Sequence, residues 1–426
     1  MAANRRWYHD CMMRRLAALT VAATMSTVLV TVEPAAAVPP GGSAGTDISH
    51  NLTFSGAPGF ANDVVVTKSG TTVTIDDTYP ISVSGDCTHP VPGDDTVAQC
   101  TVSMSPDIHV EPGDWSDRVT VIGGGSVHWL IGTGDGNDTI DLTGVTVSGS
   151  NVAAGNGNDT VTSSTHGEQI DGGAGTDTVS YAQHPGPVIV DLSTGDGGPE
   201  HDGLAAVEAV VGGPGDDTLT GDAGANTLSG GDGDDLISGG GGNDTLLGGD
   251  GADTMYGGTG VDTVSYGDHA VPVTASLDGL ANDGAPGEGD LIGSAVENLT
   301  GGSADDVLYG NDSANVLRGD PSGNWLPITG GADTIYPLGG NDVSYGLGGD
   351  DTITDGDGAD TIYGGYGADD LHGGAGGDTI HGDQGADTLS GGSGYDALDG
   401  GADIDWCHAD TGGASKTACE FPGQLP

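Results

Sequence analysis

The apolar and polar positions of this chain repeat every nine residues between residues 333 and 405. An aspartate occupies every ninth position, and the residue two places later is isoleucine or leucine in seven of the nine units, with Ser344 and Cys407 as the exceptions. Glycine fills most of the positions two, four and five before each aspartate. The unit is therefore Gly-Gly-x-Gly-x-Asp-x-U-x, where U is a large apolar residue, as in residues 373–381. A fixed short period predicts a solenoid, in which each unit buries its apolar residue only against neighbouring units.

The residue types predict a conformation for each half of the unit. The glycine-rich half turns sharply, which residues without a Cβ do at little cost. The last three residues form a short strand with U pointing inward. Two units then complete one coil, so aspartates two units apart lie on the same edge, about one strand spacing (~4.8 Å) from each other. One predicted edge carries Asp333, Asp351, Asp369, Asp387 and Asp405, and the other carries Asp342, Asp360, Asp378 and Asp396.

Carboxylates stacked in this way predict a bound cation. They repel one another unless a cation lies between them. Carboxylate and turn carbonyl oxygens suit a hard cation with six to eight ligands at roughly 2.3–2.6 Å, which describes calcium. The nonapeptide also occurs earlier in the chain, in weaker form around Asp138 and Asp159. The predicted calcium ligands are Asp138, Asp159, Asp177, Asp217, Asp235, Asp244, Asp253, Asp262, Asp306, Asp333, Asp342, Asp351, Asp360, Asp369, Asp378, Asp387, Asp396 and Asp405. Asn226 falls in phase with them and predicts a weaker site, because it keeps an oxygen but loses the charge.

Two longer segments interrupt the pattern and resemble each other, at roughly residues 172–229 and 257–318. Each contains Asp-Thr-Val-Ser-Tyr followed by a histidine, then an apolar stretch, an acidic glycine-rich stretch and Ala-Val-Glu. We predict that each inserted segment loops out and caps or thickens the solenoid. The alternative is a catalytic or zinc site that draws on His184, Glu200, His201 or His269, although no His-Glu-x-x-His spacing supports it.

Composition narrows the class of protein. Of 426 residues 83 are glycine and 4% are aromatic, so a thin solenoid core suits the chain better than one large core. The chain has 63 acidic and 8 basic residues, and 61 and 4 remain beyond residue 37, a net charge of −57. Such a chain does not bind nucleic acid or an anionic membrane by charge attraction. Low hydrophobicity with this much like charge is typical of disorder, so we expect a chain that is unfolded without cation and folded with it.

The flanking regions predict an exported protein. Residues 1–37 resemble a signal peptide, with Arg14-Arg15, an apolar run and the small residues 35–37. No other transmembrane candidate occurs. Four further cysteines predict disulfides in an oxidising compartment, with Cys87–Cys100 and Cys407–Cys419 as the local pairing among three possible ones. The predicted organisation is a signal at 1–37, an N-terminal β-rich domain with a disulfide at 38–130, repeat regions at 131–318 and 319–410, and a disulfide-tied cap at 411–426.

The repeat resembles that of the RTX hemolysin-type calcium-binding family over roughly residues 130–408. The resemblance implies an all-β, right-handed parallel β-roll with calcium held in the turns by the sixth-position aspartates and by glycine carbonyls. With its predicted N-terminal signal, the chain looks more like exported RTX-repeat proteins of Gram-positive, actinobacterial type. Thr329, Leu338, Leu347 and Asp383 replace the second glycine of their units, which predicts looser sites there.

The sequence thus predicts a secreted, non-enzymatic protein that folds on binding several calcium ions and interacts with an extracellular matrix or cell-surface component. The alternative is a secreted polysaccharide lyase or hydrolase that carries the repeats as a module, although residues 46–130 show no convergent acid–base set. Tyr345 and Tyr363 are predicted to stack as a cross-strand pair on an outer face. A sugar-binding platform is the alternative for these two rings.

Overall fold

The computed structural model describes residues 17–23, 27–34, 51–56, 60–79, 81–83, 87–94, 96–103, 105–321, 330–408 and 410–420, with the backbone alone for residues 17–34. All regular secondary structure in these ranges is β-strand, and none of these ranges contains a helix that could cross a membrane. The chain divides into two compact units, Met1–Val211 and Gly212–Pro426.

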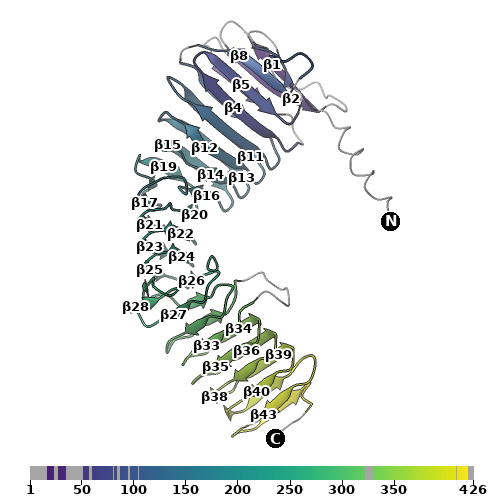
Figure 1. Ribbon diagram of the computed structural model, residues 1–426, viewed down its shortest axis with the longest axis vertical. Helices are drawn as coiled ribbons and strands as arrows, with labels where there is room; N and C mark the ends of the chain where they lie inside the picture. Colours follow the sequence, from purple (N-terminus) through teal and green to yellow (C-terminus); the bar gives the residue numbers. More distant parts are fainter. Residues whose placement is uncertain are drawn as a thin grey trace, which may run out of the picture. The chain divides into compact units, whose positions relative to one another are not determined.

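The first unit consists of coils whose strands stack in parallel in two sheets (Figure 1). One sheet contains β3 (Asn51–Ser55), β9 (Asp107–Glu111), β11 (His128–Asp135), β13 (Ser150–Asn156), β15 (Glu168–Ala174) and β19 (Asp202–Ala205). The other contains β4 (Asp63–Ser69), β10 (Arg118–Gly123), β12 (Thr139–Val145), β14 (Thr160–Thr162), β16 (Thr178–Ser180) and β20 (Ala209–Val211). The parallel stacking continues through residue 130, where the sequence predicted a domain boundary.

The N-terminal end of this unit carries antiparallel strands. β5 (Thr72–Asp77) pairs with β4 and with β8 (Val97–Thr101), and β8 also pairs with β7 (Cys87–Thr88). β1 (Ala17–Ala23) pairs antiparallel with β2 (Thr27–Pro34), whereas the pairings of β1 with β6 (Ile81–Ser82) and of β2 with β3 are parallel. β1 and β2 fall within the predicted signal peptide, whose remaining residues lie outside the described ranges, and the signal assignment stays a prediction.

The second unit has the same construction. One stack contains β21 (Thr218–Thr220), β23 (Leu236–Gly241), β25 (Thr254–Thr259) and β29 (Asp290–Ile292). A second contains β22 (Thr227–Asp232), β24 (Thr245–Asp250), β26 (Thr263–Ser265), β30 (Asn298–Thr300), β32 (Val316–Arg318), β34 (Val343–Gly348), β36 (Thr361–Tyr366), β39 (Thr379–Gln384), β42 (Asp396–Asp399) and β44 (Ala414–Thr417). A third contains β27 (Thr274–Ser276), β31 (Val307–Tyr309), β33 (Thr334–Tyr336), β35 (Thr352–Thr354), β37 (Asp370–His372), β40 (Thr388–Ser390) and β43 (Trp406–His408), beside a two-stranded ladder of β38 (Ala375–Gly376) and β41 (Ser393–Gly394).

Strand register confirms the predicted coil of two nonapeptides. Ile362 lies opposite Ile380, and Ile353 lies opposite Leu371, so neighbouring strands of one stack are 18 residues apart in sequence. The apolar residue of each unit points into the roll and is fully buried, as Ile353 and Ile362 illustrate. The chain is therefore the all-β, parallel β-roll that the sequence predicted. Ser344 is the polar exception in this core, where it is fully buried between Leu317 and Ile362.

Each predicted insertion adds a short antiparallel element beside the coils. In the first, β17 (Ile189–Asp191) and β18 (Asp196–Gly197) pair and lead into β19. In the second, β28 (Ala281–Asp283) pairs with β29. The two local disulfides, Cys87–Cys100 and Cys407–Cys419, are present as predicted. The second joins an inward-facing core position to the C-terminal segment, in which β44 adds to β42.

Candidate metal sites along two carboxylate ladders

The aspartates of successive coils are joined by hydrogen bonds from backbone to side chain. The amide N–H of Asp333 donates to Oδ1 of Asp351 at 2.8 Å, and the N–H of Asp351 donates to Oδ1 of Asp369 at 2.9 Å. The opposite edge repeats the arrangement, since the N–H of Asp342 donates to Oδ1 of Asp360 at 2.9 Å. The two predicted edges therefore exist, as two ladders. One oxygen of each of these carboxylates stabilises the protein backbone instead of facing a cation.

The second carboxylate oxygen of most predicted ligands is buried without a hydrogen-bond partner. Such orphaned acceptors are rare in folded proteins and point to an unaccounted ligand. Sixteen of the eighteen predicted ligands share this feature at Oδ2: Asp138, Asp159, Asp177, Asp235, Asp244, Asp253, Asp262, Asp333, Asp342, Asp351, Asp360, Asp369, Asp378, Asp387, Asp396 and Asp405.

In most units a glycine at the first position keeps the space beside this oxygen open. A Cβ at Gly364 would lie 2.3 Å from Oδ2 of Asp369 and 2.9 Å from the carbonyl oxygen of Gly382, the equivalent glycine one coil later. A carboxylate oxygen and a glycine carbonyl oxygen thus border one cradle. Oxygen donors of these two kinds fit calcium, as the sequence predicted. Calcium bound there would be held by Oδ2 and by turn carbonyls.

The second position of the unit tolerates a side chain at the cost of backbone strain. Leu338, Leu347 and Asp383 adopt φ of 81°, 80° and 72°, in the left-handed region where glycine is favoured. The backbone therefore follows the glycine path at these three units, so their turn carbonyls keep their positions. Thr329 lies outside the described residues.

Burial makes several ladder carboxylates weaker acids than a free aspartate. Desolvation, assisted by neighbouring carboxylates, raises the pKa of Asp333 and Asp351 from 3.8 to about 8. Burial likewise raises the pKa of Asp369 and Asp387 to about 7. A charged carboxylate at these positions is costly without a neutralising partner, and a divalent cation is such a partner.

Two predicted ligands differ from the rest because a turn amide occupies their second oxygen. Oδ2 of Asp217 accepts from the N–H of Gly213 at 2.6 Å, and Oδ2 of Asp306 accepts from the N–H of Gly302. Asn226 is similar, because its Oδ1 accepts from the N–H of Asp222 at 2.8 Å. The side-chain oxygen of Asn226, for which the sequence predicted a weak calcium site, is therefore already hydrogen-bonded. The side-chain oxygen of Asn315 likewise accepts from the N–H of Asn311 at 2.9 Å.

The ladders also contain acidic residues that the nine-residue spacing did not reveal. The N–H of Asp253 donates to Oδ1 of Asp290 at 2.9 Å, and that of Glu168 donates to Oδ1 of Asp202 at 2.8 Å. In these pairs an insertion separates the two carboxylates by 37 and 34 residues. Glutamates take the same role after Asp177, Asp262 and Asp405, through Glu208, Glu297 and Glu420.

Asp355 is a further acidic residue that the pattern missed, because it occupies a first position where glycine is usual. Its side chain is buried and neither of its oxygens has a hydrogen-bond partner. Burial, followed by the charges of Asp360, Asp342 and Asp378, raises its pKa to about 9. Asp355 therefore adds a second carboxylate to the cradle of Asp360.

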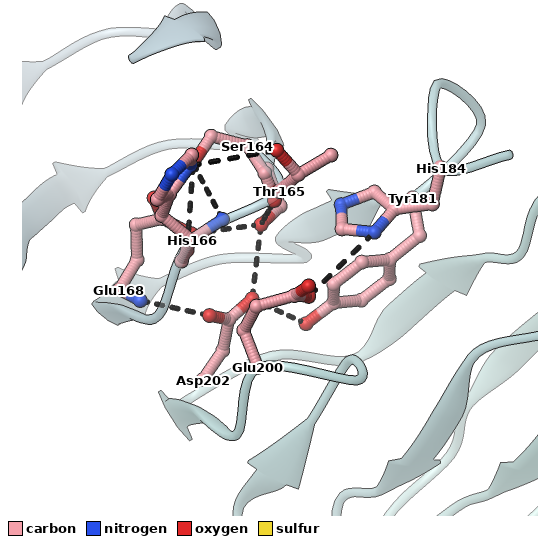
Figure 2. Close-up of polar contacts among 9 residues, drawn as sticks. Ser164, Thr165, His166, Glu168, Tyr181, His184, Glu200 and Asp202 are labelled. Atoms are coloured by element: carbon pink, nitrogen blue, oxygen red, sulfur yellow. Dashed lines mark hydrogen bonds and ion pairs between the residues drawn. The ribbon is translucent and has the colours of Figure 1, made fainter. Parts of the chain in front are cut away.

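A different polar network fills the first insertion (Figure 2). Glu168 takes a ladder position there, and serines replace the two glycines before it. Ser163 donates to Glu168 at 3.0 Å and lies 2.9 Å from Oδ2 of Asp202, while Ser164 donates to the other oxygen of Glu168. The Tyr181 hydroxyl donates to Asp202 at 3.0 Å. Burial raises the pKa of Glu168 to about 7. Serine and tyrosine hydroxyls thus donate hydrogen bonds to these carboxylates, whereas the carboxylates beside glycine turns keep an oxygen without a hydrogen-bond partner.

The second insertion repeats the tyrosine contact. The Tyr266 hydroxyl donates to Oδ2 of Asp290 at 3.0 Å, and His269 packs edge-on against Tyr266 as His184 does against Tyr181. The predicted internal duplication is therefore present in three dimensions. His201, one of the histidines considered above for a catalytic or zinc site, is exposed and pairs with Asp196.

The outer-face tyrosines stack as predicted. The rings of Tyr345 and Tyr363 are 5.0 Å apart with planes 6° from parallel, and His381 continues the stack beyond Tyr363 at 5.0 Å. Arg318 lies over the Tyr345 ring. Because neighbours cover the ring faces, the stack is a cross-strand cluster, and the faces that a sugar ring would pack on are occupied.

A parallel roll with buried carboxylates beside glycine cradles defines a class of calcium-binding β-roll proteins. Comparison with protein families agrees, since a model of the RTX calcium-binding nonapeptide repeat matches residues 150–179, 211–246, 229–264, 292–326, 345–380 and 372–407. The chain therefore contains RTX calcium-binding nonapeptide repeats between residues 150 and 407. A search of curated proteins gives no match.

Proposed function

We propose that this protein is an exported calcium-binding β-roll that completes its fold when it meets calcium outside the cell. The observation that carries the proposal is the row of buried Oδ2 atoms without hydrogen-bond partners. A buried charge without a partner destabilises a fold by several kcal/mol. Calcium at the cradles would remove this cost, so its binding energy would become folding energy.

Several features support export. Residues 1–37 have the composition of a signal peptide, and two disulfides fit an oxidising compartment. Extracellular calcium modules commonly bind with dissociation constants of roughly 10⁻⁴–10⁻³ M. Sites of that strength would stay unfilled inside a cell and fill after export.

We further propose a structural or surface-interaction role rather than catalysis, with an extracellular matrix or cell-surface component as partner. In the acid-rich cluster of the first insertion, Glu168 and Asp202 are 0% and 2% exposed and already hydrogen-bonded. A substrate would not reach them. Turnover of acidic polysaccharides by the purified protein would contradict this part of the proposal.

The test is a calcium titration followed by far-UV circular dichroism after removal of metal with a chelator. We expect a partly folded chain in chelator that gains β-structure with calcium and not with magnesium, because magnesium demands a tighter octahedral geometry. A spectrum that is already rich in β-structure in chelator, and that calcium leaves unchanged, would show that the fold needs no cation.

A further inference from the structure

We propose that Asp250, His269 and Glu288 bind a divalent transition-metal ion, such as zinc, at a site separate from the calcium ladders. One ligand atom from each residue lies within 4.8 Å of the other two. Asp250 ends β24, on a coil of the roll, whereas His269 and Glu288 belong to the second insertion. An ion bound by all three residues would fasten the insertion to that coil.

The distance between the ligand atoms of His269 and Glu288 already suits such an ion. Nε2 of His269 lies 3.3 Å from Oε2 of Glu288. Tetrahedral zinc with bonds of about 2.0–2.1 Å separates neighbouring ligand atoms by ~3.4 Å. His269 is buried and Glu288 mostly so, while Asp250 is exposed and can rotate toward them. The site is thus half assembled and still open to solvent.

The histidine ring is held with one nitrogen available to an ion. Nδ1 of His269 lies 2.9 Å from the carboxylate of Asp268, and the ring packs edge-on against Tyr266. Metal-binding histidines generally donate their second N–H to a carboxylate in this way, which fixes the tautomer and the orientation of the ring. Nε2 therefore faces Glu288 as the ligand atom.

The donor set favours a transition metal over calcium. Calcium takes oxygen ligands, whereas imidazole nitrogen suits zinc, copper, iron and nickel. Three carboxylates, those of Asp250, Asp268 and Glu288, surround one imidazole, so the local charge attracts a cation. Without an ion, a protonated His269 paired with Asp268 and Glu288 would satisfy the same atoms, and the experiment has to separate the two states.

The first insertion is a natural comparison that lacks the site. His184 packs against Tyr181 in the same way, but its Nδ1 lies 3.9 Å from Glu200, and its Nε2 has no hydrogen-bond partner (Figure 2). Counted from the tyrosine of each copy, Gln183 stands where Asp268 is, and Thr165, which precedes the first duplicated segment, stands where Asp250 is. This copy has lost both the orienting carboxylate and the third ligand.

The experiment titrates cobalt(II), and then zinc, into the full chain saturated with calcium, so that the ladders are already filled. We expect one cobalt ion per chain with a visible absorption band, which zinc displaces. D250N and H269Q should weaken binding about tenfold or more, and D268N by roughly ten- to a hundredfold through loss of orientation. D232N is the matched control, because Asp232 is exposed and lies in register with Asp250 one coil earlier. H184Q is the control in the first insertion.

Three results would overturn the proposal. They are the absence of a retained ion in the calcium-saturated chain, unchanged binding in D250N, and an equal loss in D232N, which would show attraction by general acidity. Far-UV circular dichroism checks that each variant is folded. If H269Q does not fold, D250N decides the outcome, since an exposed side chain contributes little to the fold.

Discussion

Replacing Asp351 with asparagine should stabilise the calcium-free protein, and saturating calcium should offset much or all of that gain. The substitution keeps an oxygen that can accept the Asp333 N–H, so the ladder persists. It removes the charge from the buried Oδ2, which has no hydrogen-bond partner. The size of the effect therefore depends on whether a cation occupies the cradle.

The magnitude follows from the pKa of this carboxyl, which burial raises from 3.8 to about 8. Each pKa unit corresponds to about 1.4 kcal/mol, and about pH 7.5 lies roughly 3.7 units above the unfolded pKa. Without a cation, the acid thus costs the folded state up to about 5 kcal/mol, and D351N should recover roughly 2–5 kcal/mol. With calcium at about 100 times its dissociation constant, losing one site removes about 2.7 kcal/mol.

The assay is urea unfolding at about pH 7.5, in chelator and in saturating calcium, with the bound calcium counted by calorimetry. D306N is the control, because backbone amides bond both oxygens of Asp306 and its effect should be independent of calcium. If D351N changes the free energy of unfolding by the same amount in both conditions, Oδ2 of Asp351 is not a calcium ligand and the reasoning fails.

Four further predictions follow from single features of the roll. S344V should raise the free energy of unfolding by about 1–2 kcal/mol, as measured by chemical denaturation. The reason is that an apolar side chain replaces a buried hydroxyl that has no hydrogen-bond partner between Leu317 and Ile362. A loss of stability would contradict this. D355N should lower the calcium affinity of the Asp360 cradle about tenfold in calorimetry, since it removes one of two carboxylates; unchanged affinity would place Asp355 outside the site. G367A should cost more than about 3 kcal/mol in thermal unfolding, because its Cβ would lie 1.6 Å from a neighbouring carbonyl oxygen, whereas G149A, with open space around it, should cost far less. In chelator, thermal stability should be greatest near pH 4 and fall as pH rises through about 7 to 8, since burial raises the pKa of ladder carboxylates such as Asp333 and Asp369, and calcium should reverse this trend. A rise of stability with pH in chelator would contradict these raised pKa values.

The sequence was sufficient to predict the roll because a single short rule determines it. An aspartate and an apolar residue at fixed offsets predict the edge and the core, and the 18-residue register of Ile353 and Leu371 follows directly. The same rule places Asp351 and Asp369 on one ladder. It does not predict which carboxylate oxygen is available, because that depends on the position of each backbone amide in three dimensions.

The residues that sequence reasoning missed lie where spacing or residue type departs from the rule. Asp290 continues the ladder 37 residues after Asp253, because an inserted segment intervenes. Asp117 precedes Asp138 by 21 residues, in a coil longer than two nonapeptides. A search for aspartate followed two residues later by an apolar side chain, without a fixed period, would have found both. Asp355 was hidden because it stands where a glycine was expected.

The insertions show how a ladder of buried acids continues where its regular turns stop. Next to each insertion the regular glycine turn gives way, and a tyrosine hydroxyl donates to the carboxylate instead, from Tyr181 to Asp202 and from Tyr266 to Asp290. Where the regular units resume, a turn amide does so at Asp217 and Asp306. A hydrogen bond from a neutral donor compensates part of the burial cost of one carboxylate without any ion. The same acidic position is therefore stabilised in two ways. At the insertions a protein group donates a hydrogen bond to the carboxylate. In the regular arrays, as proposed, calcium binds it.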